Sequence, residues 1–199
     1  AVEGCIASGK TTFATRLSAE TGWGLLLEDF AEVPSLGAFY ADPDRYAFQT
    51  EVEFTTAHYN LLLKASQATR PEFMVADFTL DRDLLFANIT LARQSENQKR
   101  YRELWLELAG QVPSPDCILL LQCPVEELLR RIATRGRPFE QKIDAEYLEQ
   151  LAAGLKYFYG SQDKAPVEFL DATDLSALLG QVPLIAERIV KRLKAKGAR

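Results

Sequence analysis

The sequence predicts an α/β fold with a parallel sheet, and three observations support this. Short apolar runs rich in β-branched or aromatic residues alternate with helical patterns along the chain. The runs are nearly continuous in apolar residues, which is typical of strands covered by helices on both faces. A glycine-rich loop follows the first run and precedes a helical pattern, as at the strand-to-helix turns of such sheets.

Five strands are expected, each followed by a turn residue. The first leads into Gly4, and the others lie at residues 24–27, 73–78, 117–123 and 167–170. A parallel strand needs about five residues. Since only three residues precede Gly4, we expect the natural chain to begin upstream of Ala1.

Helices are expected between these strands. The longest begins at Asp42-Pro43, because aspartate suits the N-cap and proline the first turn, and it extends to about Ala68. The other expected helices span residues 10–17, 80–91, 95–108, 125–134, 145–159 and 179–194.

Composition limits the class of protein. With 199 residues, 47% of them hydrophobic, the chain can bury one sizeable core, so one domain over residues 1–199 is expected. A net charge of -5 gives no basic footprint for nucleic acid, and no apolar run approaches the length of a membrane span. Cys5, Cys117 and Cys123 are an odd number without metal-ligand spacing, which favours reduced thiols and a cytoplasmic protein.

The segment from Gly4 to Thr11 matches G-x-x-x-x-G-K-[ST], the loop that binds nucleotide phosphates. Backbone amides of such a loop surround the phosphates, the lysine reaches their oxygens and the hydroxyl binds Mg²⁺. The chain is therefore expected to bind ATP or another nucleoside triphosphate with Mg²⁺. The residues expected to hold it are Gly4, Ala7, Ser8, Gly9, Lys10, Thr11 and Thr12.

Two carboxylates and an arginine cluster accompany this loop. Glu28 and Asp77 end the second and third strands, so they lie at the carboxyl edge of the sheet, where open α/β folds bind ligands. Four arginines flank Gly136 between Arg130 and Glu140, which is typical of a lid that neutralises a transferring phosphoryl group. For Arg130 alone, a solvated helix face remains the alternative.

Several motifs together resemble the deoxyribonucleoside kinase family over almost the whole chain. They are residues 2–12, Phe39-Tyr40, Asp42-Pro43, residues 45–48, Leu121-Gln122, Arg135-Gly136-Arg137, Glu140-Gln141 and residues 146–148. The resemblance implies a three-layer P-loop kinase fold with a five-stranded parallel sheet, helices on both faces and an arginine-rich lid. It also implies ATP-dependent phosphorylation of a deoxynucleoside 5′-hydroxyl, usually by a homodimer.

The resemblance assigns roles to individual residues. Glu28 would be the general base, and Tyr40 and Glu140 would hold the 3′-hydroxyl. The residues that would act on the phosphates and magnesium are Lys10, Thr11, Asp77, Arg131, Arg135 and Arg137. The remaining substrate-binding candidates are Glu51, Asp77 and Asp81.

The chain departs from the family pattern at two places. The family has an arginine after the third strand, where this chain has Phe78, and Arg82 one turn later is a candidate replacement. The family's base-reading glutamine falls at Glu51, and an arginine seven residues on falls at His58, the only histidine. His58 is either a satisfied helix residue or part of the base pocket.

Glu51 bears on which base is preferred. An ionised carboxylate offers only acceptors, and guanine presents two adjacent donors on its Watson-Crick edge, so deoxyguanosine ranks first. If Glu51 is protonated or turned to solvent, broad specificity is expected instead.

Two other functions remain open. A nucleoside monophosphate kinase of thymidylate-kinase type shares the loop and lid, but Glu28 would repel its phosphorylated acceptor. A non-catalytic kinase-like subunit would be favoured by loss of Lys10, Glu28 or the lid arginines, all of which are present. A homodimer could use the apolar residues Leu84, Leu85, Ile89 and Leu91, which core burial explains equally well.

Overall fold

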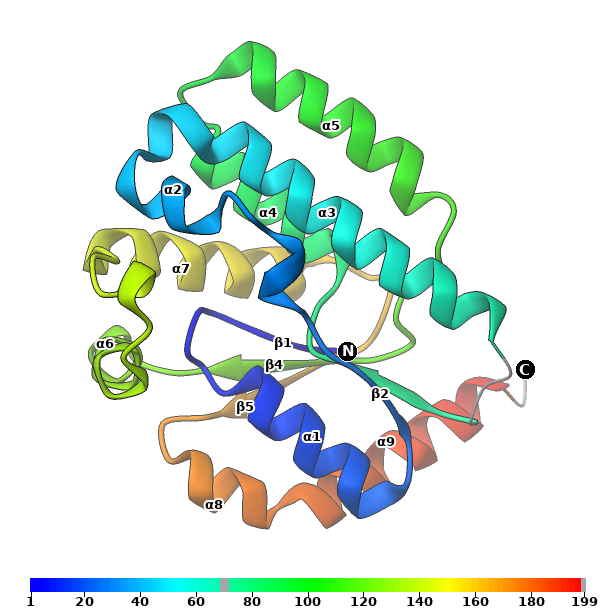
Figure 1. Cartoon of the computed structure of the whole chain (residues 1–199). Coiled ribbons are helices and arrows are strands. Elements are labelled where there is room, and N and C mark those ends of the chain that lie inside the picture. The colour runs from blue at the N-terminus through cyan, green and yellow to red at the C-terminus, as the bar shows by residue number, and fades with distance from the viewer. Residues whose placement is uncertain (69–71, 198–199) are drawn as a thin grey trace.

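The strands form two parallel ladders side by side (Figure 1). The structure, a computed structural model, describes residues 1–68 and 72–197, and all strands named here lie in those ranges. Strands β1 (Val2–Gly4), β4 (Ile118–Gln122) and β5 (Val167–Asp171) pair in the order β1-β4-β5. Strands β2 (Gly24–Leu26) and β3 (Met74–Ala76) pair with each other.

The expected single five-stranded sheet is therefore wrong in one respect, since the ladder is interrupted between the two groups. Strands β1, β2 and β3 each have only three residues, which leaves few backbone groups for pairing. A cavity of about 270 Å³ is also lined by residues from both ladders, among them Val2, Val75 and Leu119. The strand positions and the parallel directions are as expected.

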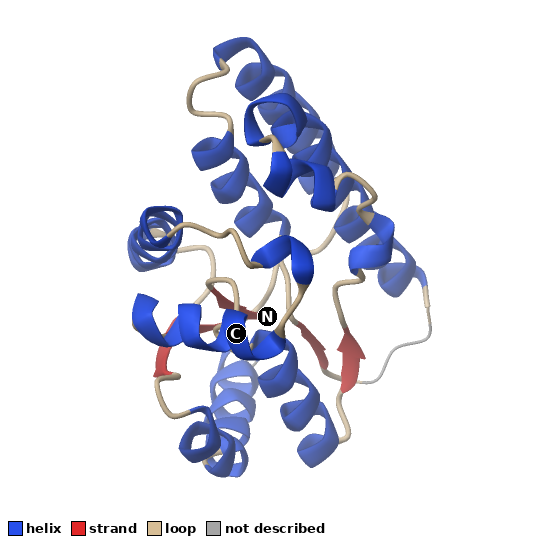
Figure 2. Cartoon of the chain, turned by 60° about the vertical axis from the view of Figure 1, so that its left-hand side comes forward, coloured by secondary structure: helices blue, strands red, loops and turns tan. Residues whose placement is uncertain are grey.

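Helices cover both faces of the strands (Figure 2). Leu119 and Leu121 of β4 pack in one cluster with Phe13 and Leu17 of α1 and with residues of α8 and α9. Ile118 and Leu120 face the opposite cluster, built with α6 and α7. Because side chains alternate along a strand, this near-continuous apolar run supplies both cores.

Further helices above α7 form a third cluster, whose buried members include Phe39, Leu91 and Trp105. The indole of Trp105 donates to the backbone oxygen of Leu80 at 2.6 Å and joins α5 to α4. The helical elements are α1 (Lys10–Thr21), η1 (Phe30–Glu32), α2 (Leu36–Ala41), α3 (Pro43–Gln67), α4 (Leu80–Thr90), α5 (Ser95–Ala109), α6 (Val125–Arg135), η2 (Pro138–Glu140), α7 (Ala145–Ser161), α8 (Leu175–Gly180) and α9 (Val182–Gly197).

Local sequence explains where the helices that carry the site begin. The Asp42 side chain accepts from the backbone N–H of Arg45, and Pro43 is in the first turn of α3, as expected. The Thr79 hydroxyl caps α4 in the same way, accepting from the N–H of Arg82 at 3.1 Å. The helix expected over residues 179–194 differs, because the chain breaks at Gln181 into α8 and α9.

None of the helices in the described ranges combines the length and apolar character that crossing a membrane requires.

Candidate active site

A cavity of about 390 Å³ lies at the carboxyl ends of the strands. Its size is within the range of pockets that bind small ligands. Most of the residues expected from the sequence line it, namely Ala7, Gly9, Lys10, Thr11, Thr12, Glu28, Tyr40, Glu51, Arg131, Arg135, Arg137 and Glu140. The structure therefore brings together residues from the phosphate loop, three helices and the arginine-rich segment.

The phosphate loop has the close backbone geometry that its motif requires. Gly4 has a φ of 152°, and a Cβ at this position would lie 2.8 Å from the backbone oxygen of Leu121. Gly9, at φ 101°, precedes the first residue of α1. Only glycine adopts such positive φ angles, and allows such a close backbone approach, without strain. The loop amides consequently lie at the N-terminus of α1, where anions bind.

The polar groups of this loop fit a triphosphate. The ammonium group of Lys10 donates to the backbone oxygens of Gly4 and Cys5, each at 3.1 Å. Ser8 Oγ is buried, and it has no hydrogen-bond partner among the described residues. Burial lowers the pKa of Lys10, and neighbouring Arg82 acts in the same direction. Both disfavour its positive charge, so a negatively charged ligand beside Lys10 would offset them.

Thr11 and Asp77 are brought together as expected for a magnesium site. Thr11 Oγ1 donates to Asp77 Oδ2 at 2.5 Å, and Asp77 Oδ1 accepts from the backbone N–H of Glu28 at 2.8 Å. Within the described residues, no group of three His, Cys, Asp or Glu side chains could hold a metal ion alone. Mg²⁺ keeps several waters and takes phosphate oxygens as ligands beside one or two carboxylates, a role that Asp77 and Thr11 could fill.

Glu28 is paired with Arg82. Arg82 Nη2 lies 2.6 Å from Glu28 Oε1, and Nη1 donates to the backbone oxygen of Asp77 at 3.0 Å. Burial alone would raise the pKa of Glu28, but Arg82 and His58 outweigh burial and hold it well below its usual range. Arg82, the candidate replacement for the family's arginine, therefore lies in contact with Glu28.

His58 is buried outside the cavity lining and contacts two carboxylates, Asp83 and Glu28, that do line it. Its Nδ1 lies 2.8 Å from Asp83 Oδ2, within hydrogen-bonding geometry, and its Nε2 lies 3.0 Å from Glu28 Oε1, outside that geometry. Burial favours the neutral ring, but Asp83 and Glu28 outweigh it and raise the pKa of His58 to about 9. His58 is therefore charged at neutral pH. Its Nδ1 is hydrogen-bonded within the fold, whereas its Nε2 has no hydrogen-bond partner among the described residues. Whether His58 belongs to the base pocket stays a prediction.

Glu51 is also buried, with 4% of its surface exposed. Thr90 Oγ1 lies 2.9 Å from its Oε1 and is the donor of that hydrogen bond. Burial, with Asp83 nearby, raises the pKa of Glu51 to about 8. Burial thus favours the protonated form of Glu51, which is the alternative that the sequence left open.

The arginines of the lid segment differ in their contacts. Arg130 is exposed and paired with Glu127, and it also lines the edge of the cavity. Arg131 donates to the backbone oxygens of Ser8 at 3.1 Å and Ala172 at 2.6 Å, and so joins α6 to the phosphate loop.

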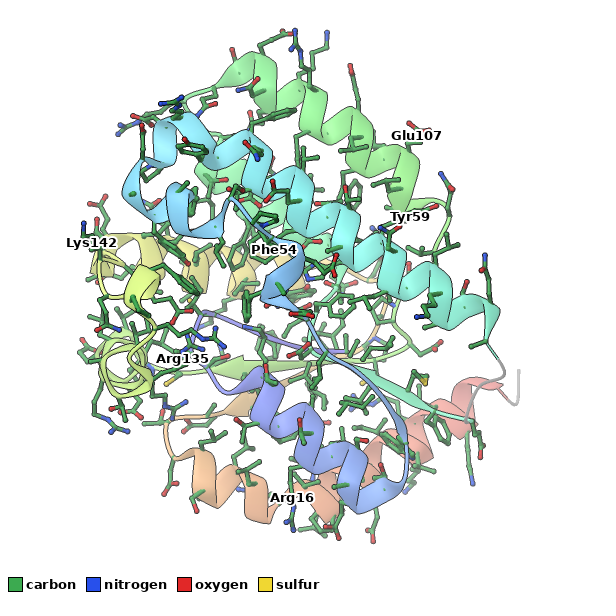
Figure 3. The ribbon with its side chains drawn as sticks, in the orientation of Figure 1. Arg16, Phe54, Tyr59, Glu107, Arg135 and Lys142 are labelled. Carbon is green, nitrogen blue, oxygen red and sulfur yellow. The ribbon has the colours of Figure 1, made fainter. Side chains whose placement is uncertain are left out.

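Arg135 and Arg137 both contact the buried carboxylate of Glu140, with Arg137 Nη1 at 3.2 Å from Oε1. Arg135 lies at the C-terminal end of α6, on the side of the helix that faces the rest of the protein (Figure 3). Tyr40 stacks on Phe139, with 5.9 Å between ring centroids, so Tyr40 and Glu140 approach the cavity together.

Asp77 and Asp81 are the exceptions among the expected substrate-binding residues, because neither lines the active-site cavity; Asp77 still contacts Thr11, and Asp81 lies apart. Asp81 is 3.9 Å from Lys164, whereas Asp83 lines the cavity. Residues two apart on a helix point in nearly opposite directions, so Asp81 and Asp83 of α4 face different sides. Asp83 is therefore the carboxylate that sequence reasoning missed.

The apolar residues suggested for a dimer face have partners within the chain. Leu91 is fully buried, Leu84 packs on the α3–α5 cluster, and Leu85 and Ile89 pack on the cluster of α7. A Cβ on Gly154 of α7 would lie 3.3 Å from Leu85 and 3.5 Å from Ile89. Core packing accounts for these side chains.

Comparison with known proteins agrees with this geometry. The family described as deoxynucleoside kinase matches residues 1–194. A deoxyguanosine kinase of Bacillus subtilis (strain 168) is 35% identical over 153 residues, which cover 76% of this chain and 73% of that protein. A deoxyguanosine kinase of Lactobacillus acidophilus is 27% identical over 210 residues, covering 98% and 91%.

Solved structures show the same fold. Deoxyadenosine kinase from M. mycoides with bound dCTP superposes with a TM-score of 0.82 at 23% identity, covering 96% of this chain and 98% of that one. The same kinase with bound dATP gives 0.80 at 25% identity, covering 94% and 96%.

The fold and the phosphate loop define a P-loop kinase, a phosphotransferase that acts on a hydroxyl acceptor. The chain belongs to the deoxynucleoside kinase family.

Proposed function

We propose that this enzyme transfers the γ-phosphoryl group of ATP to the 5′-hydroxyl of a purine deoxynucleoside, with deoxyguanosine as the preferred substrate. The observation that carries this proposal is the position of Glu28, whose carboxylate lines the same cavity as Lys10 and the arginine-rich segment. A carboxylate there accepts a proton from a hydroxyl group but repels a phosphorylated acceptor.

In the proposed reaction, Glu28 accepts a hydrogen bond from the 5′-hydroxyl and then its proton, as the oxygen bonds to the γ-phosphorus and ADP leaves. The low pKa of Glu28 makes it a weak base, but phosphoryl transfer passes through a loose transition state in which positioning matters more than base strength. Lys10 binds the phosphates, and Thr11 and Asp77 hold Mg²⁺, which neutralises charge on the phosphate oxygens when it is bound.

The arginine-rich segment is proposed to act as the lid. Arg135 and Arg137 adjoin the cavity, and arginines in this position stabilise the equatorial oxygens of the transferring group. Glu140, which pairs with both, and Tyr40 are proposed to bind the 3′-hydroxyl.

The preference for guanine rests on Glu51, because guanine can pair with this side chain in both of its protonation states and adenine in one. Ionised Glu51 accepts from N1–H and the exocyclic amine of guanine, and protonated Glu51 accepts from N1–H while donating to O6. Adenine presents an acceptor at N1, so it fits only the protonated form. Relatives named deoxyguanosine kinase in Bacillus subtilis and Dictyostelium discoideum support this ranking, although others are named deoxyadenosine kinase.

The test is turnover of ATP with each of the four deoxynucleosides and with dTMP, for the wild type and for Glu28→Gln. We expect phosphorylation of deoxyguanosine above the other substrates, and a kcat of Glu28→Gln about 10²-fold lower with little change in KM. Glu32→Gln, an exposed change in the adjoining segment, is the matched control. Near-normal kcat in Glu28→Gln would move the base role to Asp77, and turnover of dTMP alone would establish a monophosphate kinase.

Three further expectations accompany this function. A homodimer follows from the family resemblance, and a single domain follows from chain length. A cytoplasmic location follows from the cysteines, which are free thiols in the described residues.

A further inference from the structure

Two cationic side chains converge on the same oxygen of Glu28. Arg82 Nη2 is 2.6 Å and His58 Nε2 is 3.0 Å from Oε1. Among the residues that the structure describes, no hydrogen bond involves Oε2, while Glu28 lines the cavity. One carboxylate oxygen is thus held from behind, and the other is left for substrate.

The ring of His58 is itself held rigidly. Asp83 contacts Nδ1 at 2.8 Å, and only 1% of the residue is exposed. Phe78 stacks on the ring with 4.3 Å between centroids and 12° between planes, and Phe54 lies on it at 5.9 Å. The stacking on Phe78 and the contact with Asp83 together fix the orientation of the His58 ring.

The charges around His58 come from three elements. Asp83 and Arg82 are on α4, Glu51 is on α3 with His58 itself, and Glu28 follows β2. Asp83 and Glu28 are the two groups in direct contact with the ring. A chain of contacts therefore runs from Asp83 through His58 to Glu28, with a hydrogen bond at Nδ1 and an ion-pair contact at Nε2.

We propose that His58 is a positioning residue for phosphoryl transfer, which fixes the Glu28 carboxylate so that Oε2 faces the 5′-hydroxyl of the substrate. The inference rests on the proposed function of Glu28. Without His58, Oε1 would have Arg82 as its one contact, and a carboxylate with one contact can still rotate about its terminal bond. The second contact, from a ring locked between Asp83 and Phe78, removes that freedom.

A double-mutant cycle of Glu28→Gln and His58→Gln tests this role, with kcat and KM measured for ATP and the deoxynucleoside. We expect His58→Gln to lower kcat about tenfold, with KM for ATP changed by less than about twofold. In the Glu28→Gln background, the same change should have less than about a twofold effect on kcat, because His58 acts through Glu28. Asn60→Gln, at an exposed position of the same helix, is the control.

Asp83→Asn provides a second variant if His58→Gln folds poorly. It keeps the imidazole and the shape of the neighbouring side chain, and it removes the negative charge that faces Nδ1. Its effect on kcat at saturating substrate should likewise disappear in the Glu28→Gln background. If Glu28→Gln lowers kcat strongly and the effects on kcat are additive in both double variants, the positioning role of His58 is overturned while the proposed function stands. Near-normal kcat in Glu28→Gln would overturn the proposed function and the positioning role together.

Discussion

Replacing the buried Glu51 with glutamine should make the protein more stable than the wild type as the pH rises. Glutamine has nearly the same shape but does not ionise. In the folded wild type, burial raises the pKa of Glu51 from 4.5 to about 8. Between these values the native state keeps a proton that the unfolded chain has lost, so stability is fully present below pH 4.5 and falls until about pH 8.

The size of the effect follows from the shift. Each pH unit in this window lowers the free energy of unfolding by about 1.4 kcal/mol, so three units between pH 5 and 8 would amount to ~4 kcal/mol. Rotation of the side chain or entry of water would reduce this, and we expect about 2–4 kcal/mol. His58 loses its stabilising charge as the pH rises from 6.5 to about 9, but that loss is common to both proteins and cancels in their difference.

Urea unfolding at pH 5, 6, 7 and 8, followed by the fluorescence of buried Trp105, measures this difference. Glu53→Gln on the same helix is the matched control. Its pKa is lowered rather than raised, so its window lies below 4.5 and the control should show no trend between pH 5 and 8. A difference between Glu51→Gln and wild type that stays constant across this range would show that Glu51 is ionised when folded, and would refute the reasoning.

Two further outcomes are expected. Arg135→Ala and Arg137→Ala should each raise the barrier to transfer by several kcal/mol while Tm changes little. Exposed Arg100→Ala, outside the cavity lining, is the control and should leave kcat nearly unchanged. A large fall in Tm at constant kcat would make the lid arginines structural. The ratio of kcat/KM for deoxyguanosine to kcat/KM for deoxyadenosine should increase about tenfold per pH unit above pH 8 as Glu51 ionises. This trend should be absent in Glu51→Gln. A ratio that stays constant with pH in the wild type would show that Glu51 does not contact the base.

The parts of the fold that depend on residues adjacent in the sequence could be predicted from the sequence. The phosphate loop needs glycine at Gly4 and Gly9, and the Asp42-Pro43 pair gives the start of α3, because these are local backbone requirements. The break between the two ladders could not be predicted, since it depends on how short strands align across the core.

The site divides in the same way. Motif residues such as Lys10 and Glu28 could be placed from their positions after strands. The convergence of His58 and Arg82 on Glu28 joins residues 30 and 54 positions apart, so it depends on the rotation of α3 and α4. The protonation of Glu51 depends on burial, which no local pattern reports.

The cysteine inside the phosphate loop has a practical consequence for labelling chemistry. Cys5 is 4% exposed, its thiol contacts the backbone oxygen of Leu148 at 3.8 Å, and burial raises its pKa to about 11. Since only thiolates react with maleimides and iodoacetamides, Cys5 should resist them, and the buried Cys117 is shielded by the protein. Cys123 is partly exposed and lies two residues before α6. A fluorophore attached there would follow movement of α6 during turnover without modifying the loop that holds the nucleotide.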